Sequence, residues 1–207
     1  MRRPALVALV LLLAVAATAL AAPTSKRPPL HVTFVGDSVP DAISYVPAAR
    51  RRLGRGLVLR LDLRVCRRLV EPSCSYQGST PSTALDAVRS YGTALGQVLV
   101  VDVGYNEGPI GYGGGIDRVM RAALAQKAVG VVWVTLRETR DLYAQTNVAI
   151  RRATRRWPQL EVADWNAFSS GKPWFAGDGL HLTPTGAIEL ATFLRPYVLR
   201  AGGRSAA

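Results

Sequence analysis

The stretch Val32-Thr33-Phe34-Val35-Gly36-Asp37-Ser38 decides how the rest of the chain is interpreted. Its β-branched and aromatic residues are typical of a buried strand, and the glycine marks where that strand ends. We predict a strand over residues 30–36 with a serine just beyond its end. A serine hydroxyl becomes a nucleophile when a neighbouring base accepts its proton. Ser38 is therefore the candidate nucleophile, and the alternative is a serine that only caps the following helix.

The remaining apolar runs alternate between strand and helix patterns. Further strands are predicted at 57–65, 98–103, 131–136 and 160–163, and helices at 42–53, 81–91, 116–128, 143–157 and 184–199. The strand at 57–65 alternates leucines with polar residues, which favours an edge position, and residues 111–115 are expected to form a flexible turn. This order predicts an α/β fold: a three-layer α/β/α sandwich with a five-stranded, parallel, flavodoxin-like sheet in one domain, 30–200, followed by a disordered tail, 201–207.

Two polar motifs follow later in the chain. Gly104-Tyr105-Asn106 comes directly after the strand at 98–103, and Asp178-Gly179-Leu180-His181 precedes the last helix. An aspartate close to a histidine can accept the imidazole Nδ1–H and fix the orientation of the ring. We therefore expect His181 to act as the base and Asp178 as its orienting acid. The other histidine, His31, opens the first strand at the end far from Ser38, and Asp37 is expected to be structural.

Taken in order, these motifs resemble the SGNH (GDSL-type) hydrolase family. The resemblance implies an oxyanion hole that combines the backbone of Ser38, the side chain of Asn106 and a glycine that follows the second strand. Gly78, just before a predicted helix, is the candidate for that glycine. The alternative is the backbone around Cys66 and Arg67, directly after the strand.

A narrower resemblance is carried by Gly36-Asp37-Ser38-Val39, by Asp164-Trp165 and by the run from Asp178 to Gly186. These segments look like the SGNH domains found at the carboxyl end of membrane acyltransferases. Such domains are associated with O-acylation of envelope carbohydrates. The resemblance implies a free-standing relative of these domains, and it does not identify the acyl donor or the acyl acceptor.

The first 22 residues have the pattern of a secretory signal peptide. Arg2 and Arg3 precede an apolar run at 5–17, and Ala19-Leu20-Ala21 offers a small-x-small cleavage site. The alternative is an uncleaved N-terminal anchor, which would bring the protein to a membrane. Residues 23–29 are expected to be a polar leader. We therefore expect a secreted or cell-envelope protein.

The formal net charge of the chain is +12 and is carried mostly by arginine. Such a charge favours an anionic partner, for example a cell-envelope polymer. The alternative is a set of solvated arginines that reflects a GC-rich genome. Nucleic acid is not expected, because the chain has no recognition motif and no basic run interleaved with aromatic residues. A monomer is expected.

The two cysteines of the chain, Cys66 and Cys74, are close in sequence. In an exported protein this spacing predicts a disulfide. With His31 and His181 far away, these cysteines do not have the spacing of metal ligands, so we expect no metal and no cofactor.

Three further residues are candidates for binding the substrate. Tyr105 and Trp174 fall on predicted loops near the site, where aromatic rings could stack on a sugar, although such rings also fill cores. Arg137 ends the fourth strand and could bind an anionic group of the substrate bidentately. It could instead pair with Glu138 or Asp141.

The residues point to an exported serine esterase that hydrolyses small O-acyl esters, with O-acetyl groups on carbohydrate as the expected substrate. An O-acyltransferase that passes the acyl group to an envelope glycan shares the first half of that reaction. A non-catalytic carbohydrate-binding module on a degenerate hydrolase fold is the alternative from another class.

Overall fold

The structure is a computed structural model that describes residues 28–204. The predicted signal peptide and the leader up to residue 27 lie outside the described residues. Five parallel strands form one sheet in the order β2-β1-β3-β4-β5. The strands are β1 (Leu30–Gly36), β2 (Leu57–Leu63), β3 (Val98–Asp102), β4 (Gly130–Val134) and β5 (Leu160–Ala163). The predicted five-stranded, parallel α/β fold is confirmed.

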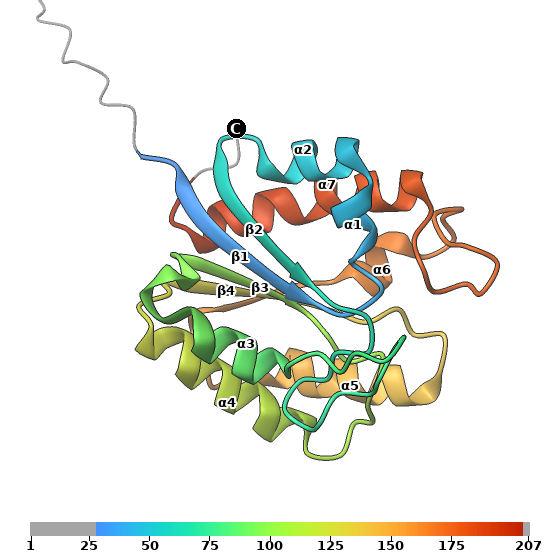
Figure 1. Ribbon diagram of the computed structural model, residues 1–207, viewed down its shortest axis with the longest axis horizontal. Coiled ribbons are helices and arrows are strands. Elements are labelled where there is room, and N and C mark those ends of the chain that lie inside the picture. Colours follow the sequence, from blue (N-terminus) through green and yellow to red (C-terminus); the bar gives the residue numbers. More distant parts are fainter. Residues whose placement is uncertain (1–27, 205–207) are drawn as a thin grey trace, which may run out of the picture.

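Helices cover both faces of this sheet, as Figure 1 shows. One face is covered by α3 (Ala84–Tyr91), α4 (Tyr112–Ala125) and α5 (Asp141–Ala153). The other is covered by α1 (Ala42–Tyr45), α2 (Pro47–Gly54) and α7 (Pro184–Ala201). A 3-10 helix, η1 (Gly92–Leu95), and the short α6 (Trp165–Ser169) complete the described elements. None of the helices in residues 28–204 has both the length and the apolarity needed to cross a bilayer.

The burial of the strands explains their sequences. Every residue of β3 and β4 is buried, because both faces of these central strands are covered by helices. β2 alternates half-buried and exposed residues over Leu57–Leu61 and lies at the edge of the sheet, as its leucine alternation predicts. All five strands run in the same direction, so their carboxyl ends share one edge of the sheet, and the serine after β1 lies there.

The predicted flexible turn at residues 111–115 is wrong. Gly111 is the N-cap of α4, and Tyr112 to Gly115 form its first turn. Tyr112 is buried and donates its hydroxyl to the carbonyl of Val103, which fixes the start of the helix. Gly115 packs so closely on Leu69 that an added Cβ would lie 2.9 Å from a leucine methyl. Tertiary packing therefore overrides the low helix propensity of this glycine run.

Other boundaries differ for local reasons. The helix predicted at 42–53 is divided at Val46, because Pro47 starts a new helix. The helix predicted at 81–91 begins at Ala84, where the Thr83 side chain accepts the Asp86 N–H at 3.0 Å. The five-residue α6 was not predicted. α7 continues to Ala201, and the residues up to 204 turn back on it through hydrogen bonds, so the expected disorder from 201 does not apply to them. Residues 205–207 lie outside the described residues.

Candidate active site

Ser38, His181 and Asp178 form a hydrogen-bonded relay. Ser38 Oγ lies 3.0 Å from His181 Nε2. His181 Nδ1 lies 2.6 Å from Asp178 Oδ2. Ser38 follows β1, whereas the other two residues lie 140 or more positions later, before α7. The fold thus brings together the three residues that the sequence singled out, in the order that nucleophile, base and orienting acid require.

A hairpin over residues 174–183 carries the histidine and the acid. The Thr183 N–H donates to the Trp174 carbonyl at 2.9 Å, and the Ala176 N–H donates to the His181 carbonyl at 2.7 Å. Gly179 has φ +70°, a left-handed conformation that suits glycine. Asp178 Oδ1 accepts the N–H groups of Leu180 and His181 at 2.9 and 3.0 Å, which closes the turn. The turn therefore aims the second oxygen of Asp178 at the imidazole.

Hydrogen bonding holds Asp178 in its ionised form. Its bond to the His181 ring, together with the two backbone N–H bonds, lowers the pKa of this carboxyl to about 2. About half of each of these two side chains is exposed. The acid is thus ionised over the whole neutral range and can stabilise a charged imidazole.

Asp37 lies beneath the relay and organises the backbone around it. It is fully buried, and its Oδ1 accepts the Val39 N–H at 3.1 Å. Its Oδ2 accepts the N–H groups of Gly104 and Tyr105, each at 3.2 Å. Burial raises the pKa of Asp37 to about 6, although the three N–H bonds oppose that rise. One carboxyl thus ties the Ser38 turn to the Gly-Tyr-Asn segment, the structural role expected for it.

Asp102, the last residue of β3, is a second buried carboxyl next to Asp37. Its backbone carbonyl accepts the Asp37 N–H at 3.0 Å, and its Oδ1 has no hydrogen-bond partner among the described residues. Burial, and then the negative charge of Asp37, raise the pKa of Asp102 well above its usual range.

Asn106 is hydrogen-bonded to Arg67, in the loop that follows β2. Its Nδ2 donates to the Arg67 carbonyl at 3.2 Å, and the Arg68 Nε donates to the Asn106 carbonyl at 2.8 Å. Gly78, in contrast, lies in an exposed turn closed by hydrogen bonds between Tyr76 and Ser79. Among the described residues, it makes no hydrogen bond to Ser38, His181 or Asn106. The contacts thus favour the alternative backbone around Cys66 and Arg67.

This backbone is fixed by a disulfide and a buried ion pair. Cys66 and Cys74 are bonded, as predicted, with their Cα atoms 5.1 Å apart. Cys66 has φ +69° in a turn in which the Arg67 N–H donates to the Arg64 carbonyl at 3.2 Å. The Arg67 side chain is 2% exposed and pairs with Asp62 at 3.0 Å. A charge this deeply buried requires such a partner.

The candidate substrate-binding residues have different surroundings. Tyr105 is buried in the core, and its hydroxyl accepts the Arg137 N–H at 2.7 Å, so the structure does not present it to a substrate. Trp174 is half-buried and stacks on Trp165 with ring centroids 5.7 Å apart. Arg137 makes no ion pair with Glu138 or Asp141 within residues 28–204. Its guanidinium lies over Phe175 and donates to the Gly179 carbonyl.

Glu107 lies beside Asn106 and was not singled out from the sequence. It follows Asn106, and its Oε1 accepts the Leu69 N–H at 2.6 Å, a further link between the two loops. Burial raises the pKa of Glu107 to about 7. The only sequence signal was its position next to Asn106, since the contact with Leu69 joins segments 38 residues apart.

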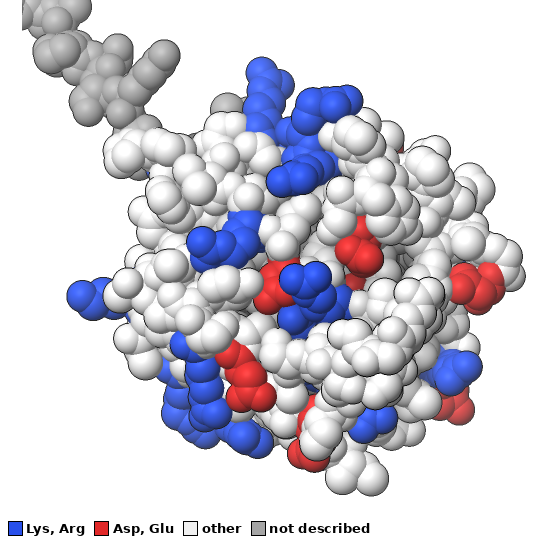
Figure 2. All heavy atoms as spheres, viewed as in Figure 1, with Lys and Arg blue, Asp and Glu red and all other residues white. Residues whose placement is uncertain are grey.

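Further charged side chains lie on the surface away from Ser38 and His181. On the face shown in Figure 2, Lys and Arg side chains lie in several separate groups, and acidic side chains lie beside some of them. Arg151, Arg156 and Arg200, for example, form ion pairs with acidic side chains. Within the described residues, no three His, Cys, Asp or Glu side chains cluster in a way that could hold a metal ion.

Comparison with known proteins gives structural relatives only. No family model matches the sequence, and no curated protein matches it. A carbohydrate acetylesterase family member from Sinorhizobium meliloti is similar in structure at 13% identity, with a TM-score of 0.62 over 84% of this chain and 99% of that one. The psychrotrophic esterase EstA from Pseudoalteromonas sp. is similar at 10% identity, with a TM-score of 0.61 over 82% and 96%.

A family 3 carbohydrate esterase from Clostridium thermocellum is also similar, at 14% identity, with a TM-score of 0.52 over 80% of this chain and 92% of that one. At identities this low, the likeness concerns the fold. The chain therefore has the α/β fold of these esterases.

Proposed function

We propose that this protein is an exported serine esterase of the SGNH type that hydrolyses small O-acyl esters, O-acetyl esters of carbohydrate in particular. The observation that carries the proposal is the unbroken relay from Ser38 Oγ through the His181 ring to Asp178. Its spacings fall in the range that proton transfer between side chains requires.

In the first half-reaction, His181 Nε2 accepts the proton of the Ser38 hydroxyl as Oγ attacks the ester carbonyl. The C–O bond to the alcohol breaks, and the imidazolium returns its proton to that alcohol. In the second half, His181 takes a proton from a water molecule as that water attacks the acyl-Ser38 ester. The bond from the acyl carbon to Ser38 Oγ then breaks, the imidazolium returns its proton to Oγ, and the carboxylic acid leaves with Ser38 regenerated. Asp178 stays ionised throughout and stabilises the imidazolium, in keeping with its pKa of about 2.

The negative charge that develops on the carbonyl oxygen needs N–H donors placed in advance. We assign these donors to the Ser38 N–H, the Asn106 Nδ2 and the Cys66 N–H, in place of Gly78. The Asn106–Arg67 hydrogen bond supports this assignment. The turn at Cys66 supports it as well. The Arg67 N–H donates to the Arg64 carbonyl, whereas the Cys66 N–H has no hydrogen-bond partner among residues 28–204.

The substrate class and the location rest on independent support. A carbohydrate acetylesterase family member and a family 3 carbohydrate esterase are among the proteins with a similar fold. The Cys66–Cys74 disulfide suits an oxidising compartment, and the predicted signal peptide supplies the route. The half-exposed acid and base suit an ester group on a large carbohydrate better than a molecule that must be enclosed.

The test is hydrolysis of 4-nitrophenyl acetate and release of acetate from acetylated xylan, by the wild type and by Ser38→Ala. We expect the variant to lose kcat by about a thousandfold or more with an unchanged thermal unfolding temperature. Ser44→Ala, at an exposed serine on α1, is the matched control and should be fully active.

A fluorophosphonate provides a second reading that does not depend on the choice of substrate. It should add once to the wild type and to Ser44→Ala but not to Ser38→Ala, as measured by intact mass. Labelling at another serine, or near-normal turnover by Ser38→Ala, would show that the relay is not the catalytic apparatus.

A further inference from the structure

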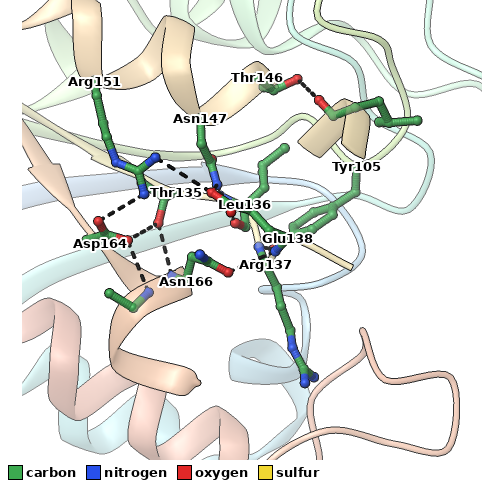
Figure 3. Close-up of polar contacts among 12 residues, drawn as sticks. Tyr105, Thr135, Leu136, Arg137, Glu138, Thr146, Asn147, Arg151, Asp164 and Asn166 are labelled. Carbon is green, nitrogen blue, oxygen red and sulfur yellow. Dashed lines mark hydrogen bonds and ion pairs between the residues drawn. The ribbon is translucent and has the colours of Figure 1, made fainter. Parts of the chain in front are cut away.

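The segment that follows β4 is clamped from one side by a buried asparagine, as Figure 3 shows. Asn147, fully buried on α5, accepts the Leu136 N–H and donates to the Leu136 carbonyl, each at 2.7 Å. The same Nδ2 donates to Glu138 Oε1 at 2.9 Å. Between these two residues, the Arg137 N–H donates to the Tyr105 hydroxyl at 2.7 Å. Three consecutive residues are thus held by side chains from two other segments.

A second set of contacts clamps the same segment from the side of α6. The Glu138 N–H donates to Asn166 Oδ1 at 2.9 Å. Thr135 Oγ1 donates to Asp164 at 3.0 Å and accepts the Asn166 N–H at 3.0 Å. Arg151 joins the two acidic groups, at 3.0 Å from Asp164 and 3.6 Å from Glu138. The backbone of Arg137 is therefore a rigid support.

The side chain of Arg137 leaves this network, and in Figure 3 it extends away from the other labelled residues. Its guanidinium carbon lies 3.6 Å from the centre of the Phe175 ring, close enough for a cation–π contact. Its Nη1 donates to the carbonyl of Gly179. Phe175 and Gly179 belong to the 174–183 hairpin, and Gly179 lies between Asp178 and His181. Arg137 therefore joins the rigid support to the hairpin that carries the acid and the base.

The tip of the hairpin, residues 176–181, makes few other hydrogen bonds to the rest of the protein. Within the described chain, the hydrogen bonds that leave residues 176–181 are the one from Arg137 to Gly179 and the one between His181 and Ser38. The Asp178–His181 pair lies inside the tip, so it keeps its own geometry wherever the tip moves. That pair alone cannot set the distance from the imidazole to the serine.

We propose that Arg137 is a positioning residue, whose contacts with Gly179 and Phe175 keep His181 within hydrogen-bond reach of Ser38. This inference rests on the proposed esterase function and replaces the substrate-binding role first expected for Arg137. A displacement of about 1 Å breaks a 3.0 Å hydrogen bond between reacting groups and can cost about a hundredfold in rate.

The kinetic test compares Arg137→Gln and Arg137→Lys on 4-nitrophenyl acetate, a substrate without charge. We expect Arg137→Gln to lower kcat about tenfold to a hundredfold and to leave KM within about twofold. Arg137→Lys keeps a cationic donor and should retain more activity. Arg140→Gln, at an exposed arginine of the same connection, should match the wild type. An unchanged kcat, or a loss confined to KM for a uronate-containing acetylated polymer, would overturn the proposal.

A second reading does not require activity. The chain has two histidines, so the imidazole signals of His181 and His31 can be assigned by NMR. We expect the His181 signals of Arg137→Gln to move towards those of Ser38→Ala, in which the serine bond is absent, while His31 stays in place and shows that the fold is intact. If the His181 signals of Arg137→Gln coincide with the wild type, the positioning role is refuted, even if the wild type proves not to be an esterase.

Discussion

Replacing Asp37 by asparagine should change how the stability of the protein depends on pH. The carboxyl is fully buried, and its pKa is raised to about 6 from the usual 3.8. The folded protein therefore binds the Asp37 proton more tightly than the unfolded chain does. Between pH 3.8 and 6, the folded state carries more protons, and its stability falls as pH rises.

The size of this effect follows from the shift. About two pKa units correspond to about 3 kcal/mol between strongly acidic and neutral pH. About 2 kcal/mol of this falls between pH 4.5 and 7.5, a range suitable for unfolding experiments. Asparagine does not titrate, so Asp37→Asn lacks this dependence. It also loses an acceptor for one of the backbone N–H bonds, which costs about 1–3 kcal/mol at every pH.

The assay is urea unfolding of the wild type and Asp37→Asn at several pH values from 4.5 to 7.5. The difference between the two proteins removes the groups that titrate alike in both, and leaves Asp37 together with its charge coupling to Asp102. As pH rises from 4.5 to 7.5, the free energy of unfolding of the wild type should fall by about 2 kcal/mol relative to that of the variant. Asp141→Asn, at an exposed aspartate, should run parallel to the wild type within about 0.5 kcal/mol. Parallel curves for Asp37→Asn would refute a raised pKa at this carboxyl.

Asp178→Asn should lower kcat at pH 8 by less than His181→Ala does, because a poorly oriented imidazole still accepts a proton part of the time; equal losses would contradict this. The Cys66–Cys74 disulfide should leave no thiol that can be alkylated without a reductant, and Cys74→Ser should lower the free energy of unfolding by about 2–3 kcal/mol, as measured in urea. Glu107, whose pKa is about 7, is less favourable to the fold once ionised, so Glu107→Gln should raise Tm more at pH 8 than at pH 5. A larger rise in Tm at pH 5 than at pH 8 would show that burial does not raise the pKa of Glu107.

The parts of the fold that the sequence predicts correctly are those with a local physical cause. Val98–Val101 of β3 and the whole of β4 are apolar on both faces, which favours the centre of a parallel sheet. Asp178 and His181 are three residues apart, so a turn is enough to bring them together. Ser38 joins them because parallel strands end at one edge of the sheet.

The parts that were missed depend on contacts between distant segments. Asn106 meets Arg67 across 39 residues, and no periodicity marks that meeting. Tyr105 follows a strand, as a surface aromatic might, yet its ring packs edge-on against Tyr143 in the core. Arg137 follows β4 in sequence, but its partners lie about 40 residues later in the hairpin.

In the proposed reaction, the exposure of the Asp178–His181 pair bears on which molecule removes the acyl group from Ser38. With about half of each side chain open to solvent, water reaches the acyl-enzyme without a closing step that would exclude it. Any hydroxyl of a sugar must then compete with bulk water for the same carbonyl carbon. The product ratio of new ester to free acid should therefore rise in proportion to the concentration of added alcohol. An acceptor could dominate only by binding beside Ser38, which makes the division between hydrolysis and transfer a matter of acceptor affinity.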